Sequence, residues 1–282
     1  MLKSPKSVLA ISLIALGSLC LPQSAHADVP ALAKIKAAAE AGDPEAQFSF
    51  AKSFSALTPE WRHWLTASAD QGYGPAEDEL AWTPQGFNFS IPYTEPKQRA
   101  YHLKSHSPQM KEALIRASSA SDKGFRRSRL LLAHAYANGY FVPIDRVEAY
   151  KWVTLAGGDD IFAGVTTSGL KSTLLKTMPL ADVQAGEALA KRYQPGNTVL
   201  QVRNAVIVPL LKLTGIASSG DERIAIINGT RFVAGKSALI ITDGLSVSVR
   251  CVSVDDKGAV IALPPDNKPI TLRQGSPPVV AP

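Results

Sequence analysis

The sequence predicts an α+β protein of two domains: an α-solenoid of helix-turn-helix repeats, then a small all-β domain of about five strands. Three observations predict this. Glycines recur in one register through the first part of the chain, residues 131–156 contain a helix end, a turn and a helix start in order, and the apolar period changes from 3.6 to 2 after residues 194–197. With 282 residues, 45% of them hydrophobic, the chain can bury a core in each domain.

Residues 1–27 are predicted to be a signal peptide. Lys3 and Lys6 precede an apolar run at 8–21, and Ala25-His26-Ala27 has the small-x-small form of a cleavage site. The run is shorter than the roughly 20 residues that cross a bilayer. We therefore expect cleavage before Asp28 and a periplasmic or secreted protein; the alternatives are an uncleaved anchor in the inner membrane or, less favoured, a lipoprotein attached at Cys20.

Loss of this leader lowers the formal charge from +6 to +4, because it removes two lysines and no acid. The remaining basic residues form no run interleaved with aromatic side chains. We therefore expect no nucleic-acid partner.

Gly42, Gly72 and Gly124 mark three units in residues 28–193. A small residue follows each glycine at the fourth position, and an apolar residue with an alanine follows at the eighth and ninth: Ala46, Ala76, Ser128; Phe50-Ala51, Leu80-Ala81, Leu132-Ala133. This common register favours stacked helical repeats over the alternative, an irregular helical bundle.

Residues 131–156 show how a repeat is built. Asn138-Gly139 ends one helix with a left-handed cap, and Asp145 is placed to cap the next. Glu148, three residues later, completes a predicted capping box. An apolar stripe then follows at Ala149, Trp152, Val153 and Ala156.

The pattern Tyr136-x-x-Gly139-x-x-Val142-x-x-Asp145-x-x-x-Ala149-x-x-Trp152 resembles the Sel-one-like repeat, a relative of the tetratricopeptide repeat. The chain departs from that family at Asp160, where a glycine is usual. The resemblance implies stacked helix pairs that hold a protein partner in a concave groove.

An insertion at 84–107 separates the second and third units, whose glycines lie 52 residues apart instead of 30. Three prolines exclude a long helix there, and Phe87, Phe89, Tyr93 and Tyr101 supply aromatic surface. The insertion either binds a ligand or folds back on the repeats. Residues 169–193, broken at Met178-Pro179, are predicted to be a terminal cap, as in Sel-one-like arrays, and 194–204 a linker.

The β-domain is predicted at 205–275, with a flexible tail at 276–282. Asn228-Gly229 indicates a tight hairpin between strands at 224–227 and 230–233. The apolar alternation shifts after Cys251, which predicts a β-bulge, and Cys251 itself is expected to be a buried hydrophobe.

Leu213-Thr214-Gly215-Ile216, Ala225-Ile226-Ile227-Asn228-Gly229 and Val233-Ala234-Gly235 look like the small periplasmic β-domains of type II secretion and type IV pilus accessory proteins. Lys236 stands where that family usually has an acid. The resemblance implies docking to an envelope assembly of that kind.

The sequence contains no recognisable catalytic, metal or phosphate-binding motif. His102 and His106 have metal-ligand spacing, yet no nearby acid or cysteine completes a site. We therefore expect no enzyme, no catalytic, cofactor-binding or metal residues and no cofactor.

The favoured function is an exported protein–protein interaction scaffold in the bacterial envelope, whose repeats bind a partner and whose β-domain docks to an assembly. One alternative is a cell-wall or carbohydrate binder that uses the aromatic insertion. A less favoured alternative is an envelope hydrolase with His63 or His134 as base.

Overall fold

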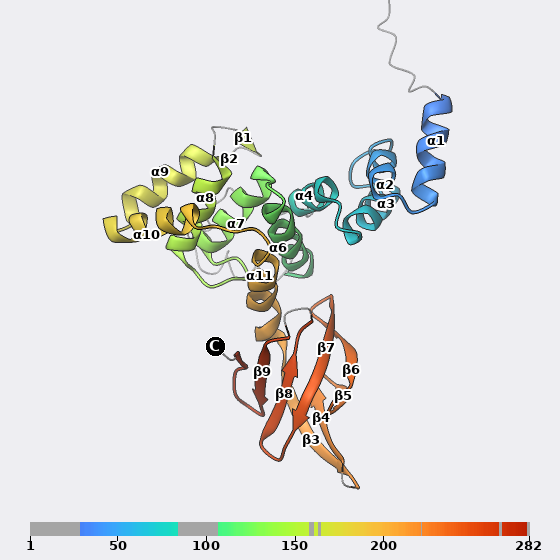
Figure 1. Cartoon of the computed structure of the whole chain (residues 1–282), viewed down its shortest axis with the longest axis vertical. Helices are drawn as coiled ribbons and strands as arrows, with labels where there is room; N and C mark the ends of the chain where they lie inside the picture. Colours follow the sequence, from blue (N-terminus) through green and yellow to red (C-terminus); the bar gives the residue numbers. More distant parts are fainter. Residues whose placement is uncertain are drawn as a thin grey trace, which may run out of the picture.

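The computed structural model describes residues 29–83, 107–157, 161–162, 165–220, 222–264 and 267–280. The predicted leader and almost all of the 84–107 insertion, with His102 and His106, lie outside these residues. Helices come first and strands second, so the α+β class is confirmed. Figure 1 shows the strands from β3 onward as one body beneath the helices, joined to them through α11, whereas β1 and β2 lie beside α8 and α9.

Ten α-helices are described. They are α1 (Val29–Glu40), α2 (Pro44–Ala51), α3 (Pro59–Asp70), α4 (Gly74–Trp82), α6 (Ser107–Asp122), α7 (Arg126–Asn138), α8 (Arg146–Ala156), α9 (Thr167–Thr177), α10 (Leu180–Lys191) and α11 (Thr198–Ile207). From α1 to α8 each described helix packs on the next, and α10 packs on α8. A short ribbon of β1 (Ile161–Phe162) and β2 (Val165–Thr166) precedes α9.

The three glycines that mark the units, together with Gly139, end helices in the same way. Gly42, Gly72, Gly124 and Gly139 have positive φ angles, from 67° to 97°. The residue after each one donates its N–H to the carbonyl five residues earlier; for example, Tyr140 donates to Ala135 at 2.9 Å. This is the Schellman turn, which a residue without Cβ adopts at low cost. The sequence register therefore corresponds to a repeated turn geometry.

Neighbouring units also share a polar contact in that register. Gln71 donates to Gln47 at 2.8 Å, and Lys123 pairs with Glu77 at 2.6 Å. In both pairs, the residue before a glycine contacts the residue five positions after the preceding glycine. Equivalent positions therefore meet at successive unit boundaries.

The predicted cap at Asp145 is confirmed, but the capping box is wrong. The Asp145 carboxylate accepts the N–H of Glu148 at 2.9 Å. The Asp145 N–H donates to the Tyr136 carbonyl at 3.0 Å, so Glu148 has no donor to satisfy there. Glu148 instead forms an ion pair with Lys151. Packing of the turn on α7 decided this contact.

The helices predicted at 169–193 are present as α9 and α10, which are separated at Met178-Pro179. The predicted linker at 194–204 is different, because residues from Thr198 onward form α11. Val202 and Val206 on this helix are buried, and the helix packs on α6. Burial of its apolar face outweighs the low helix propensity of its β-branched residues.

The β part has eight described strands instead of about five. A sheet in the order β3-β4-β5 contains β3 (Leu213–Ser219), β4 (Glu222–Ile227) and β5 (Thr230–Val233). A second antiparallel sheet, in the order β10-β9-β8-β7-β6, contains β6 (Ser237–Thr242), β7 (Leu245–Val254), β8 (Gly258–Ala262), β9 (Pro269–Arg273) and β10 (Val279–Val280). The sequence prediction missed β6, and it placed β10 in the flexible tail, whereas Val279 pairs with Thr271.

The hairpin and bulge predictions are confirmed. Asn228 and Gly229 both have positive φ, as the tight turn between β4 and β5 requires. The pairing of β7 with β8 shifts register between Cys251 and Ser253. Asp243-Gly244 forms a second turn with two positive φ angles, between β6 and β7.

Two apolar clusters form the core. The smaller one joins α2, α3 and α4 around Trp61 and Leu65. The larger one runs without interruption from Ala81 and the α6–α8 helices through α11 to both sheets, ending at Leu272. The helices from α6 onward and both sheets therefore share one apolar cluster.

We expect Gly139→Val to lower the free energy of unfolding by about 1 kcal/mol or more, because a β-branched residue resists positive φ. Gly139→Asn is the matched control and should cost less, since asparagine tolerates this conformation. Chemical denaturation of the full chain measures both. Equal stability of Gly139→Val and the wild type would contradict the assigned turn.

We expect Asp145→Ala to cost roughly 0.5–2 kcal/mol through loss of the N-cap of α8. Asp145→Asn keeps an oxygen acceptor and should remain close to the wild type. Thermal unfolding followed by circular dichroism compares the three proteins. If the alanine and asparagine variants unfold together, the cap contributes no stability.

Candidate functional site

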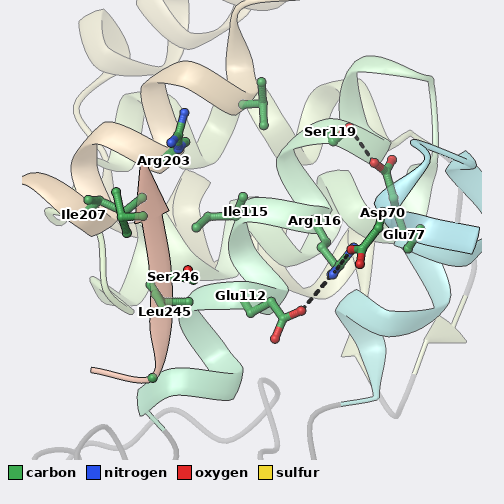
Figure 2. A pocket seen from close by; sticks show the side chains of 14 residues that line it. Asp70, Glu77, Glu112, Ile115, Arg116, Ser119, Arg203, Ile207, Leu245 and Ser246 are labelled. Atoms are coloured by element: carbon green, nitrogen blue, oxygen red, sulfur yellow. Dashed lines mark hydrogen bonds and ion pairs between the residues drawn. The ribbon is translucent and has the colours of Figure 1, made fainter. Parts of the chain in front are cut away.

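A hollow of about 660 Å³ lies where the helices meet the β part (Figure 2). Its walls come from the α3–α4 pair, α6, α11 and the start of β7. The lining residues are Ala69, Asp70, Glu77, Glu112, Ile115, Arg116, Ser119, Val199, Arg203, Ile207, Gly244, Leu245, Ser246 and Val247. The hollow therefore depends on segments that lie far apart in the sequence.

Arg116 is the centre of its polar wall. Its guanidinium donates to Asp70 at 2.7 Å and to Glu112 at 2.9 and 3.0 Å. Burial lowers the pKa of Arg116, but hydrogen bonds and charge interactions with these two carboxylates raise it by more. The side chain of Arg116 is 15% exposed, whereas those of Asp70 and Glu112 are 61% and 52% exposed. Both carboxylates thus keep oxygen surface available to a further cation.

A second set of polar contacts, made by Glu77, joins α4 to α6 next to the contacts of Arg116. Glu77, whose side chain is 8% exposed, accepts from Ser119 at 2.9 Å and from Lys123 at 2.6 Å. These contacts lie at the boundary between the two apolar clusters. The hollow therefore opens at the boundary where polar contacts join α4 to α6.

The opposite wall is largely apolar, apart from Ser246 and from Arg203 on α11, whose guanidinium donates to the Pro264 carbonyl. Figure 2 shows Ile115 on α6, Ile207 on α11 and Leu245 on β7 around the cavity. An aliphatic chain can contact these side chains while a cationic end reaches Asp70 or Glu112. A lysine or arginine side chain of another protein has both parts.

The β7 wall is held by the Asp243-Gly244 turn. Asp243 forms an ion pair with Lys111 on α6, whose side chain is 8% exposed. A Cβ atom added at Gly244 would lie 2.6 Å from the Cβ of Pro108. Gly244 also has a φ angle of 76°, a conformation that residues with a side chain rarely adopt. Only glycine fits this approach without a shift of the turn or of α6.

The two histidines considered as hydrolase bases lie in different surroundings. His134 on α7 is 6% exposed, and its Nε2 has no hydrogen-bond partner among the described residues. Burial lowers the pKa of His134 to about 4. His63 is exposed on α3, with its ring 5.1 Å from that of Trp64. Neither histidine lines the hollow.

Trp61 and Cys251 both lie in the core. Trp61 is 1% exposed, and Cys251 is fully buried as predicted, with burial raising the pKa of its thiol. Within the described ranges, no group of three or more His, Cys, Asp or Glu side chains could hold a metal ion. None of the described helices is both long and apolar enough to cross a membrane.

Sequence reasoning missed the hollow. The Glu112–Arg116 pair has i,i+4 spacing and could have been recognised on a predicted helix. The contact between Arg116 and Asp70, 46 residues apart, has no sequence signal. The contribution of β7 also depends on packing across the core.

No protein-family model and no curated protein matches the chain. One solved structure that is similar is a protective antigen of uropathogenic Escherichia coli strains, described as displaying an SLR fold. The two share 18% identity with a TM-score of 0.36, over 68% of this chain and 46% of the antigen. The chain thus spans less than half of the antigen's length. The fold described above follows from the arrangement of this chain's own helices and strands.

We expect His134 to make stability pH-dependent. As pH falls, His134 binds a proton near its ordinary pKa of 6.5 in the unfolded chain, but only near its pKa of about 4 in the folded protein. Stability should therefore fall as pH drops from about 6.5 toward 4, by about 2–3 kcal/mol in total. Urea unfolding at several pH values measures this loss.

His134→Gln removes the titrating group. The free energy of unfolding should therefore change less between pH 6.5 and 4 in this variant than in the wild type. His63→Gln is the matched control, because His63 is exposed. If the stability of His134→Gln depends on pH as that of the wild type does, His134 is not a buried neutral group that controls this dependence.

Proposed function

We propose that the protein is an exported interaction scaffold of the bacterial envelope. Its helical units bind a protein partner, and its β part docks to an envelope assembly of the secretion or pilus kind. The chain acts as an adaptor without catalysis or a cofactor. Export is inferred from the leader sequence at 1–27, and the assembly from the β-domain resemblance.

The observation that carries the proposal is the hollow between the middle of the helical array and the β part. Helices that stack through one repeated turn present a continuous surface, which is the usual binding surface of such arrays. Here that surface contains a hollow with a largely apolar wall and two exposed carboxylates. This chemistry suits a basic side chain projecting from a partner protein.

The test neutralises one carboxylate at a time, so that Arg116 always keeps one partner. Asp70→Asn and Glu112→Gln should each lower recovery of a cross-linked envelope partner by about threefold or more, as expected for lost charge complementarity. Glu60→Gln is the control, since Glu60 is exposed on α3 and lies outside the hollow.

The proteins are cross-linked in cells, purified through a tag, and compared by quantitative mass spectrometry. Circular dichroism verifies that all variants remain folded. Recovery of the same proteins in the same amounts with every variant would show that the hollow is not the partner site.

A further inference from the structure

The β6 edge is the most unusual surface of the β part. Leu239 and Ile241 on β6 are 65% and 79% exposed, although both are large apolar residues. Within the described part of the chain, β6 pairs with β7 on one side and ends the five-stranded sheet on the other. Edge strands normally carry charges or prolines that prevent pairing, and Ser237–Thr242 contains neither.

The outward face of this edge continues into the hollow. Residues directly opposite each other on paired strands point to the same face. Ile241 lies opposite Ser246, and Ser246 lines the hollow. At the C-terminal end of β6, the outward face therefore reaches the β7 residue that lines the same hollow as Asp70 and Glu112.

The other end of β6 is basic. Arg250 lies opposite Ser237 on the same outward face, and Lys236 immediately precedes the strand. Both side chains are exposed, and neither forms an ion pair with a described residue. Charge along the edge thus runs from cationic at the start of β6 to acidic at its end.

We propose that β6 binds an extended peptide of a partner protein as an added antiparallel strand. The peptide has basic residues before and acidic residues after a stretch of alternating apolar residues. An antiparallel strand brings its N-terminal end to the hollow and its C-terminal end to Lys236 and Arg250, so the charges set its direction. Backbone pairing supplies affinity, and contacts with Leu239 and Ile241 select apolar side chains.

This inference rests on the proposed function and specifies the chemistry of the partner. The probe is a fluorescent peptide with two lysines, a middle of alternating valine and threonine as long as β6, and two glutamates. Its matched control exchanges the lysines with the glutamates. Fluorescence anisotropy with the full chain should show the first peptide binding about fivefold or more tightly, with the preference falling at high salt.

The double variant Leu239→Thr, Ile241→Thr should weaken binding of the first peptide by about tenfold, while its β-branched replacements preserve the strand. Val279→Thr, Val280→Thr is the matched control, because β10 is the opposite edge of the same sheet and is also exposed. Lys236→Gln with Arg250→Gln should reduce the preference between the two peptides, because only the acidic end of the edge then discriminates them; Arg273→Gln on β9 should leave the preference unchanged.

Failure of the first peptide to bind, equal binding of both peptides, or an equal loss in the β6 and β10 variants would each overturn the proposal. A dimer seen by analytical ultracentrifugation and lost in the β6 variant would also overturn it, since the edge would then pair with a second copy. If these results occur while Asp70→Asn still loses the cross-linked partner, the scaffold function stands and only the peptide site fails.

Discussion

The contact between the Asp243-Gly244 turn and the first turn of α6 determines how the helices and sheets are joined. Lys111 is almost buried, so loss of Asp243 would leave an unpaired charge in the protein interior. Gly244 lies against Pro108 at a distance that leaves no room for a side chain. Because β7 starts at this turn, the same contact fixes the β wall of the hollow and the direction of the β6 edge.

The boundary between the two apolar clusters is joined through polar groups. Glu77 and Arg116 pair with residues on the neighbouring helix, and Asp78 accepts both the N–H and the hydroxyl of Ser128. Buried polar groups cost stability unless they are satisfied, so these pairs constrain how α3 and α4 pack on α6 and α7. The arrangement leaves carboxylates at a surface where a partner can reach them.

Much of the helical part was predictable because its turns depend on local chemistry. A glycine at positive φ, or an aspartate that caps the next helix, is recognisable within a few residues. The same chemistry identified Asn228-Gly229, and it was also present at Asp243-Gly244, where the hairpin of β6 with β7 was missed. Glu148 shows the limit, because its predicted capping role was lost to a contact between the turn and α7.

The sequence by itself determined the order of helices before strands, the register of the glycine turns, the Asn228-Gly229 hairpin and the bulge after Cys251. These features follow from backbone conformations and apolar periods within short segments. Only the tertiary structure decided that Thr198–Ile207 is a helix, that β10 pairs with β9, and that Asp70 meets Arg116. Each of these depends on burial or charge pairing between distant segments, which short-range patterns do not encode.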